Sequence, residues 1–354
     1  MNILNRSESP IILPEKPWEM ETDILYSIAV LPDPEVDRLR LYYLVRNYRK
    51  KEVGLLCVAF SEDGYSWTRP EFSDGTNIVM RPAGPPIEKG FFVPFSVLYD
   101  PWETEAADRW KMIYWDRPGR DDPTGICLAV SPDGLRWRPT GRNPIITANN
   151  DAASLLCTDP NLPKPHPLFA APYFIYQQTW RYDPSLPQDK DLVPGMRRQI
   201  SLWRGDRFSG DDSEAQWRGP FLLLAPDELD PPDTQFYWLC PFHTKNEYRA
   251  FLNVHHTIDQ TMDVQMVSSA DGMAWNRLHD RTPVLPRRGP GWWDCGMVKV
   301  ISPPVYWKGR TLVFYNGRST THDWKPRYPD GPEPNAPSGI GVVEVEPDWA
   351  VPVI

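Results

Sequence analysis

Acidic residues recur at five separated places in the chain, each just before a segment rich in β-forming residues. The residues concerned are Glu19 and Asp23, Glu88, Asp151, Asp233, and Asp294. Carboxylates that converge on one pocket can serve as a general acid and a general base, or as a nucleophile. A turn or cap role explains each carboxylate equally well when it is taken alone. A catalytic interpretation therefore depends on a fold that brings the five places together.

A repeated signature shows how the chain could do this. The pattern Ser-x-Asp-Gly-x-x-Trp occurs at 61–67, 131–137 and 269–275, and its aspartates are 70 and 138 residues apart. The second spacing is about two units, so a degraded fourth copy is expected near position 202, followed by Trp217. Periodic self-similarity predicts a repeat architecture. Five units of about 70 residues account for the 354-residue chain.

Each repeat contains three segments of aromatic and β-branched residues, and a weaker fourth follows the tryptophan. First strands are predicted at 24–31, 91–99, 153–158, 235–242 and 295–302, second strands at 38–47, 109–117, 172–180, 247–256 and 309–318, and third strands at 54–60, 125–130, 197–203, 263–268 and 338–349. The 41 prolines and 22 glycines are spread along the chain and leave few windows with a helical period. The sequence predicts an all-β, five-bladed β-propeller with four antiparallel strands per blade, as one domain over 1–354.

The signature itself is interpreted as structural, because Asp-Gly forms turns and the serine and aspartate can bond nearby backbone groups. In an up-and-down blade this turn lies on the face opposite to the start of the first strand. The pocket is therefore expected at the other end of the central channel, where the acidic segments meet the ends of the second strands.

Composition narrows the classes of partner. The chain has 38 Lys and Arg against 47 Asp and Glu, which gives a net charge of −9, and it has no basic run. This balance argues against nucleic acid or an anionic membrane as a partner and favours a neutral or cationic small ligand. The five cysteines form no CxxC pair, so they are expected as core residues. The sequence has no apolar segment typical of a signal peptide or a membrane span, and a cytoplasmic protein is predicted.

The predicted blades, the signature turns and the phrases SVLYDPWE, RWKMIYW and GWWDCGM resemble glycoside hydrolase families 32 and 43 and their relatives. The resemblance covers nearly the whole sequence. It implies an enzyme that cleaves a terminal glycosidic bond, such as a furanosidic one, of a small glycan or glycoside, with two carboxyl groups flanking the bond. The sequence departs from both families at the first blade, where WEMETD replaces their Asp-Pro and Asn-Asp-Pro-Asn-Gly-like runs, and it lacks the Arg-Asp-Pro and Glu-Cys phrases of family 32.

The resemblance assigns catalytic roles by position. Glu19 or Asp23 would be the base or nucleophile of the first blade, Glu88 would take the second-blade place, and Asp151 the third. Asp294, in the fifth blade, is a further catalytic candidate.

A second set of residues is predicted to bind the substrate. Its members are Arg46, Arg117, Trp180, Asp233, Trp238, His255, Trp293 and Arg318. An arginine offers a rigid fork of donors for hydroxyls or a carboxylate, with an ion pair to a neighbouring acid as the alternative. A tryptophan could stack on a sugar ring, although packing between blades is its commoner role. Of the adjacent His255 and His256 at most one faces the channel, where a hydroxyl contact is favoured over a metal ligand.

Two other functions stay open at this point. One is a propeller that binds carbohydrate without cleaving it, and the other is a propeller recruited to phosphorolytic or metabolite-tailoring chemistry. No cofactor is expected to be required, and a divalent cation in the channel is left open. The sugar, the linkage, exo or endo action and the oligomeric state are not predicted, because the conformations of loops such as 181–198 and 319–337 do not follow from the sequence.

Overall fold

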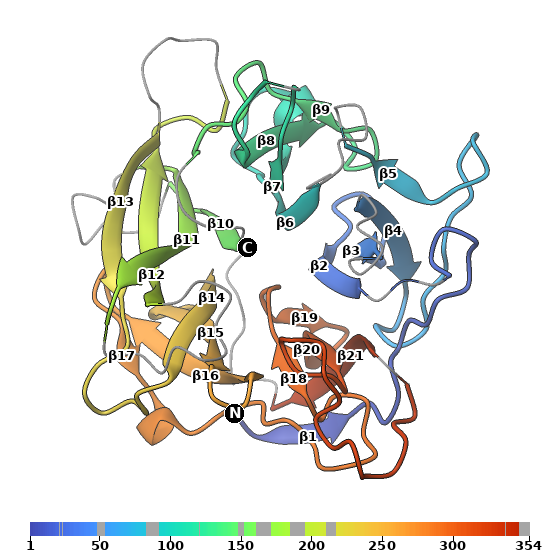
Figure 1. The fold of residues 1–354 in the computed structure, drawn as a ribbon. Coiled ribbons are helices and arrows are strands. Elements are labelled where there is room, and N and C mark those ends of the chain that lie inside the picture. The colour runs from blue at the N-terminus through green and yellow to red at the C-terminus, as the bar shows by residue number, and fades with distance from the viewer. Residues whose placement is uncertain are drawn as a thin grey trace.

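The computed structural model describes residues 1–20, 22, 24–47, 54–82, 92–119, 121–147, 152–160, 171–184, 195–209, 217–336 and 338–346. Strands dominate this part of the molecule, and the sheets surround a central axis (Figure 1). The fold class predicted from the sequence, an all-β propeller, is confirmed.

Three sheets consist of four consecutive antiparallel strands each. They are β2 (Ile24–Pro32), β3 (Leu39–Arg46), β4 (Leu55–Ser61) and β5 (Ile78–Met80); β6 (Val93–Tyr99), β7 (Trp110–Asp116), β8 (Gly125–Ser131) and β9 (Arg138–Pro139); and β10 (Ala153–Cys157), β11 (Tyr173–Tyr182), β12 (Met196–Gly205) and β13 (Trp217–Leu224). The first strand of each sheet is followed by its antiparallel neighbours in sequence order, as the predicted repeat requires.

The fourth sheet has nine strands. It contains β14 (Thr234–His243), β15 (Tyr248–His256), β16 (Thr261–Ser269), β17 (Asn276–Arg277), β18 (Met297–Lys299), β19 (Val305–Trp307), β20 (Arg310–Arg318), β21 (Ser338–Val345) and β1 (Ile3–Arg6). Only one residue pair, Met262 with Met297, links β16 to β18. Division of the sheet at this pair separates β14–β17 from β18–β21 with β1, which matches the predicted repeats, but the count of five blades stays a prediction.

Every strand predicted from the repeat coincides with an observed strand, with ends that differ by a few residues. One pairing was not predicted. The N-terminal strand β1 pairs antiparallel with the C-terminal strand β21, with Arg6 opposite Val343. The first and last strands therefore share one sheet, and β1 takes the place of the fourth strand expected after the last repeat.

The signature turns have the structural role predicted for them. In the second copy, the Asp133 carboxylate accepts hydrogen bonds from the backbone N–H groups of Leu135 and Arg136, both at 2.9 Å, while the Ser131 hydroxyl accepts one from Gly134 N–H, also at 2.9 Å. Gly134 has a φ of 70°, which favours glycine. The other two copies repeat the same bonds.

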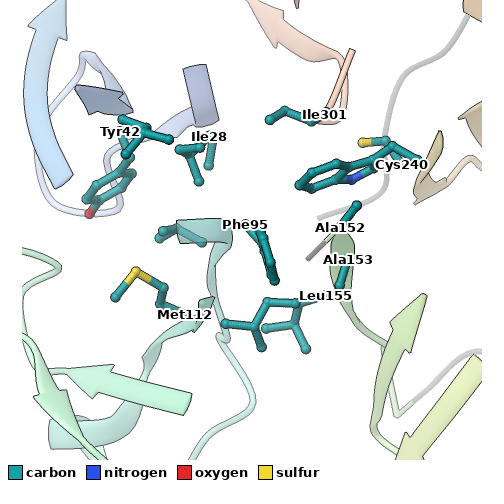
Figure 2. Close-up of a cluster of buried hydrophobic side chains, with 14 of the residues drawn as sticks. Ile28, Tyr42, Phe95, Met112, Ala152, Ala153, Leu155, Cys240 and Ile301 are labelled. Carbon is teal, nitrogen blue, oxygen red and sulfur yellow. The ribbon is translucent and has the colours of Figure 1, made fainter. Parts of the chain in front are cut away.

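The core consists of buried side chains that several neighbouring sheets contribute together. Figure 2 shows side chains from the first strands of several sheets gathered near the axis, among them Ile28, Phe95, Ala153 and Cys240, together with Ile301. All of them are buried. No disulfide joins the five cysteines; four are buried, as expected of core thiols, and Cys157 is partly buried. Among the described residues no helical segment has the length and hydropathy needed to cross a membrane.

Candidate functional site

A cavity of about 490 Å³ lies at the axis of the ring of sheets. Residues of β2, β6, β14 and β18, the first strands of their groups, line it together with residues of β3, β7, β11, β12 and β20. Ile28 and Ile301 belong both to this lining and to the apolar cluster of Figure 2. The cavity therefore adjoins the apolar core, and its charged groups come from β3, β12, β18 and β20.

The charges of the lining all have one sign in the described part of the molecule. Arg46, Arg198, Lys299 and Arg318 line the cavity, and no described lining residue is a carboxylate. This differs from the expectation of a neutral or cationic ligand, which rested on the net charge of −9. Net charge is a sum over the whole surface, whereas a ligand inside the cavity is exposed mainly to the nearest charges.

Aromatic side chains hold two of these cations in place. The guanidinium of Arg198 lies 4.3 Å from the centre of the Trp180 ring and 5.5 Å from that of Tyr237. The ammonium group of Lys299 lies 4.4 Å from the Tyr26 ring and 5.7 Å from the Tyr237 ring. Such cation–π contacts orient a cation without neutralising it.

Arg318 is a buried cation at the end of β20. Its side chain is only 4% exposed and lies 4.0 Å from the centre of the Trp324 ring. One guanidinium nitrogen donates to the Thr321 carbonyl at 2.5 Å, while Nε has no hydrogen-bond partner among the described residues. Both of these contacts are to neutral groups.

A neutral imidazole adjoins the cations. His322 Nε2 lies 3.3 Å from the Tyr237 hydroxyl, and the His322 ring lies 4.6 Å from the ring of His255. Burial, reinforced by Arg198, Arg318 and Lys299, holds the pKa of His322 well below its ordinary value. His322 therefore adds no positive charge at neutral pH and can serve as a hydrogen-bonding group.

A bulge places two adjacent side chains in the cavity. Tyr237 and Trp238 both line it, although successive residues of a regular strand face opposite ways. The pairing of β14 with β15 shifts register between Phe236 and Trp238, which re-aims the side chains at this point. Equivalent shifts occur in β2 and β6.

Four of the residues predicted to bind substrate meet at this cavity: Arg46, Trp180, Trp238 and Arg318. The indole N–H of Trp238 donates to the Ser154 hydroxyl at 2.6 Å, which fixes the ring. Their role in binding substrate stays a prediction.

Glu19 lies elsewhere, outside the cavity lining. It is fully buried and accepts hydrogen bonds from the Tyr43 hydroxyl at 2.6 Å and from Arg69 Nε at 2.8 Å. Burial alone would raise the pKa of Glu19, but the bonds from Arg69 and Tyr43 hold it below its ordinary value. These contacts describe an ionised carboxylate with structural partners, and its catalytic role stays a prediction.

Asp294 is likewise committed to structural partners. It is fully buried and pairs with Arg6 at 2.6 Å and Arg288 at 2.8 Å, while the Tyr315 hydroxyl donates to it at 2.9 Å. Its neighbour Trp293 stacks on Tyr315 with ring centres 5.5 Å apart and does not line the cavity. The carboxylate thus ties β1 to the segment before β18, and its catalytic role stays a prediction.

The remaining predicted residues fall into two groups. Asp233 accepts a hydrogen bond from Ile258 N–H at 3.1 Å, Arg117 donates to Thr124 at 3.3 Å, and His255 is fully buried beside His322; none of the three lines the cavity. Asp23, Glu88 and Asp151 lie outside the described residues, so the predicted carboxylate pair is untested.

Among the residues that the structure describes, no group of three or more His, Cys, Asp or Glu side chains is placed to hold a metal ion.

Sequence reasoning missed Arg198, Lys299, His322 and Trp324. Arg198 stands in a third strand and Lys299 inside a first strand, whereas the predicted site drew only on strand starts and second-strand ends. A signal was present for Lys299, because a lysine at an alternating position of the apolar run CGMVKVIS is unusual for a strand facing a core.

Comparison with solved structures identifies many proteins of this shape. A structure described as a glycoside hydrolase matches with a TM-score of 0.65 at 12% identity, over 100% of this sequence and 95% of that one. A structure from the GH130 family of mannoside phosphorylases, which contains glycoside hydrolases that target β-1,2 mannosidic linkages in Candida mannan, gives 0.59 at 12% identity over 100% and 96%. A fructofuranosidase from Schwanniomyces occidentalis complexed with fructosylnystose gives 0.56 at 11% identity over 96% and 60%.

No family model and no curated protein matches the sequence. The structural likeness covers nearly the whole molecule and establishes the fold: it is that of the β-propeller glycoside hydrolases. At identities of 11% to 12% the likeness carries no assignment of substrate or catalytic residues.

Proposed function

We propose that this protein is a carbohydrate-active enzyme that cleaves a terminal glycosidic bond of a small glycan or glycoside in the axial cavity. The observation that carries the proposal is the cavity itself. Its volume of about 490 Å³ is in the range of small-molecule sites, and aromatic rings stand beside polar donors within it. Sugars present apolar ring faces and polar edges, which such a lining complements. The fold, shared with glycoside hydrolases, supports the same conclusion.

The acid–base pair is assigned to the acids that the structure has not placed in other roles. Glu19 and Asp294 are each held by arginines outside the cavity. We therefore propose that the pair comes from Asp23, Glu88 and Asp151, the other residues assigned by position from the resemblance. Loss of a general acid or base lowers turnover about 10²- to 10⁴-fold.

The experiment measures release of 4-nitrophenol from a panel of aryl pyranosides and furanosides, neutral and acidic, with and without inorganic phosphate. D151N and E88Q are expected to lose turnover at least about 10²-fold while their melting temperatures stay within a few degrees of wild type. E62Q, which removes a carboxylate at an exposed turn position, is the matched control and is expected to keep full activity. Full activity of both D151N and E88Q on a cleaved substrate would reject the assignment.

A carbohydrate-binding propeller without catalysis is the second candidate. It is favoured by one observation, the lack of any carboxylate among the described lining residues. This function predicts that sugars raise the melting temperature while no glycoside in the panel is cleaved, with or without phosphate.

A further inference from the structure

We infer that the axial cavity recognises an oxyanion attached to its sugar ligand, a carboxylate or a phosphate ester, and that Arg318 is the group that binds it. The inference rests on the proposed function, because it names the class of substrate for the same cavity.

The first observation is the state of Arg318. A buried charge is unfavourable unless it is paired or bound by other polar groups. Arg318 is 4% exposed, yet within the described ranges its side chain has one hydrogen-bond acceptor, the Thr321 carbonyl, and one aromatic contact, the ring of Trp324. Its Nε has no hydrogen-bond partner among the described residues, and the side chain lines the cavity. An oxyanion in the cavity would supply both the charge and the missing acceptor, since a guanidinium binds carboxylate and phosphate in a fork.

The second observation is the convergence of charge from other elements. Arg198 comes from β12 and Lys299 from β18, and both lie within 6 Å of the Tyr237 ring centre. Both line the same cavity as Arg318 and His322. Burial lowers the pKa of His322, and the three cations lower it further. An anionic group bound near His322 would interact favourably with each of the three cations.

The rest of the lining indicates that the anion is part of a sugar. Arg198 lies against the ring of Trp180, and Lys299 lies against the ring of Tyr26. Aromatic surface therefore adjoins the cations. Trp238 and the apolar Ile28 and Ile301 complete a cavity of about 490 Å³, much larger than an inorganic ion requires. A ligand that fills this space has an apolar face as well as a charged group, which describes a sugar acid or a sugar phosphate.

The test is binding and does not depend on turnover. Melting temperatures are measured for the full-length protein with D-glucuronate, D-galacturonate and glucose 6-phosphate, against D-glucose and D-galactose, at equal ionic strength; inorganic phosphate is tested alone. We expect at least one anionic sugar to bind at least about 10-fold more tightly than its neutral counterpart, because a bond to a charged group is stronger than one between neutral groups.

Variants then assign the contact. R318Q is expected to weaken binding of that anionic sugar about 10- to 100-fold and to leave binding of the neutral sugar nearly unchanged. R318K is expected to restore binding of the anionic sugar in part. R136Q removes the same charge from a side chain that is 82% exposed and is expected to bind as wild type. If R318Q does not fold, K299Q replaces it and is expected to show the same selective loss.

Several outcomes overturn the inference. One is equal binding of neutral and anionic sugars, and another is equal weakening of binding by R318Q and R136Q. A third is that inorganic phosphate alone gives the whole rise in melting temperature and competes with the sugar, which would define a site for the free ion. Cleavage of neutral glycosides without preference for acidic ones overturns the inference and leaves the proposed function standing. Selective binding of an anionic sugar without cleavage of any glycoside supports the inference and counts against the enzyme.

Discussion

The signature turn at Asp133 allows a stability prediction to be worked from the structure. Its Oδ1 accepts hydrogen bonds from the N–H groups of Leu135 and Arg136 and from the Ser131 hydroxyl at 2.9 to 3.0 Å, and its Oδ2 pairs with Arg136 Nε at 2.7 Å. The variant D133N keeps the size of the side chain and removes its charge. We expect this single change to destabilise the protein, because the charged form is the one that the turn binds most strongly.

The magnitude follows from the pKa of Asp133. Burial would raise this pKa, but the N–H groups of Arg136 and Leu135 and the Arg136 and Ser131 side chains lower it from 3.8 to about 2. A difference of this size corresponds to roughly 2 kcal/mol of stabilisation at neutral pH. The Asp133 side chain is 28% exposed and the Arg136 side chain 82%, so solvent screening reduces the expected loss in D133N to about 1 to 2 kcal/mol.

The assay is urea unfolding of wild type and D133N at pH 7, 4 and 2.5. A carboxyl whose pKa is lower in the folded state contributes its full stabilisation above the unfolded value of 3.8 and loses it as the pH falls through about 2. The difference between the two proteins is therefore expected to be largest at pH 7 and to shrink at pH 2.5. D37N, at a side chain that is 81% exposed, is the control and should cost less than about 0.5 kcal/mol. Equal losses in D133N and D37N at pH 7, or a D133N loss that persists undiminished at pH 2.5, would refute the reasoning.

Three further predictions concern stability. R6M should lower the free energy of unfolding by about 2 to 3 kcal/mol in urea titrations, because it leaves buried Asp294 with Arg288 as its remaining cation; a loss under about 0.5 kcal/mol would contradict the role of β1 as an anchored strand. G134A should lower the free energy of unfolding clearly more than G75A in the same titrations. Both glycines have positive φ, but an added Cβ at Gly134 would overlap the Tyr42 hydroxyl, whereas at Gly75 nothing lies within 4 Å. G75A should therefore cost only the backbone strain, about 1 to 2 kcal/mol. H322Q should lose less stability than wild type between pH 7 and 5. The folded protein holds the pKa of His322 below the unfolded value of 6.5, so wild-type stability falls as the unfolded state takes up a proton. Unfolding free energies of the two proteins that change equally with pH would count against a buried neutral imidazole.

The fold could be predicted because its signals are local and repeated. Each blade strand carries its own aromatic and β-branched pattern, and the signature fixes the period, so even the degraded copy falls on an observed strand, β12. The pairing of β1 with β21 has no such signal. Its first register pair, Ile3 with Val345, joins residues far apart in the sequence, and a short strand of four residues has no distinctive pattern.

The candidate site could be predicted only in part, because a repeat locates strand ends but not the direction in which side chains point. Arg46 and Arg318 were found, since each ends a second strand at the cavity. Glu19 stands before a first strand but turns toward Tyr43 and Arg69. The bulge in β14 adds a further difficulty, because strict alternation would have placed only one of two adjacent residues in the cavity.

The cavity residues and the signature turns occupy opposite ends of the same strands. In the sheet of β3, Arg46 pairs with Ile24 at the cavity end, whereas Leu39 pairs with Ser61 at the end that carries the signature turn. The hydrogen bonds of the turns thus lie at the far end of the strands from the cavity. Glu19 and Asp294, which precede β2 and β18, are not among its lining residues. We expect a ligand that brings an opposite charge to the cavity to bind Arg318, whose Nε has no hydrogen-bond partner in the described part of the molecule.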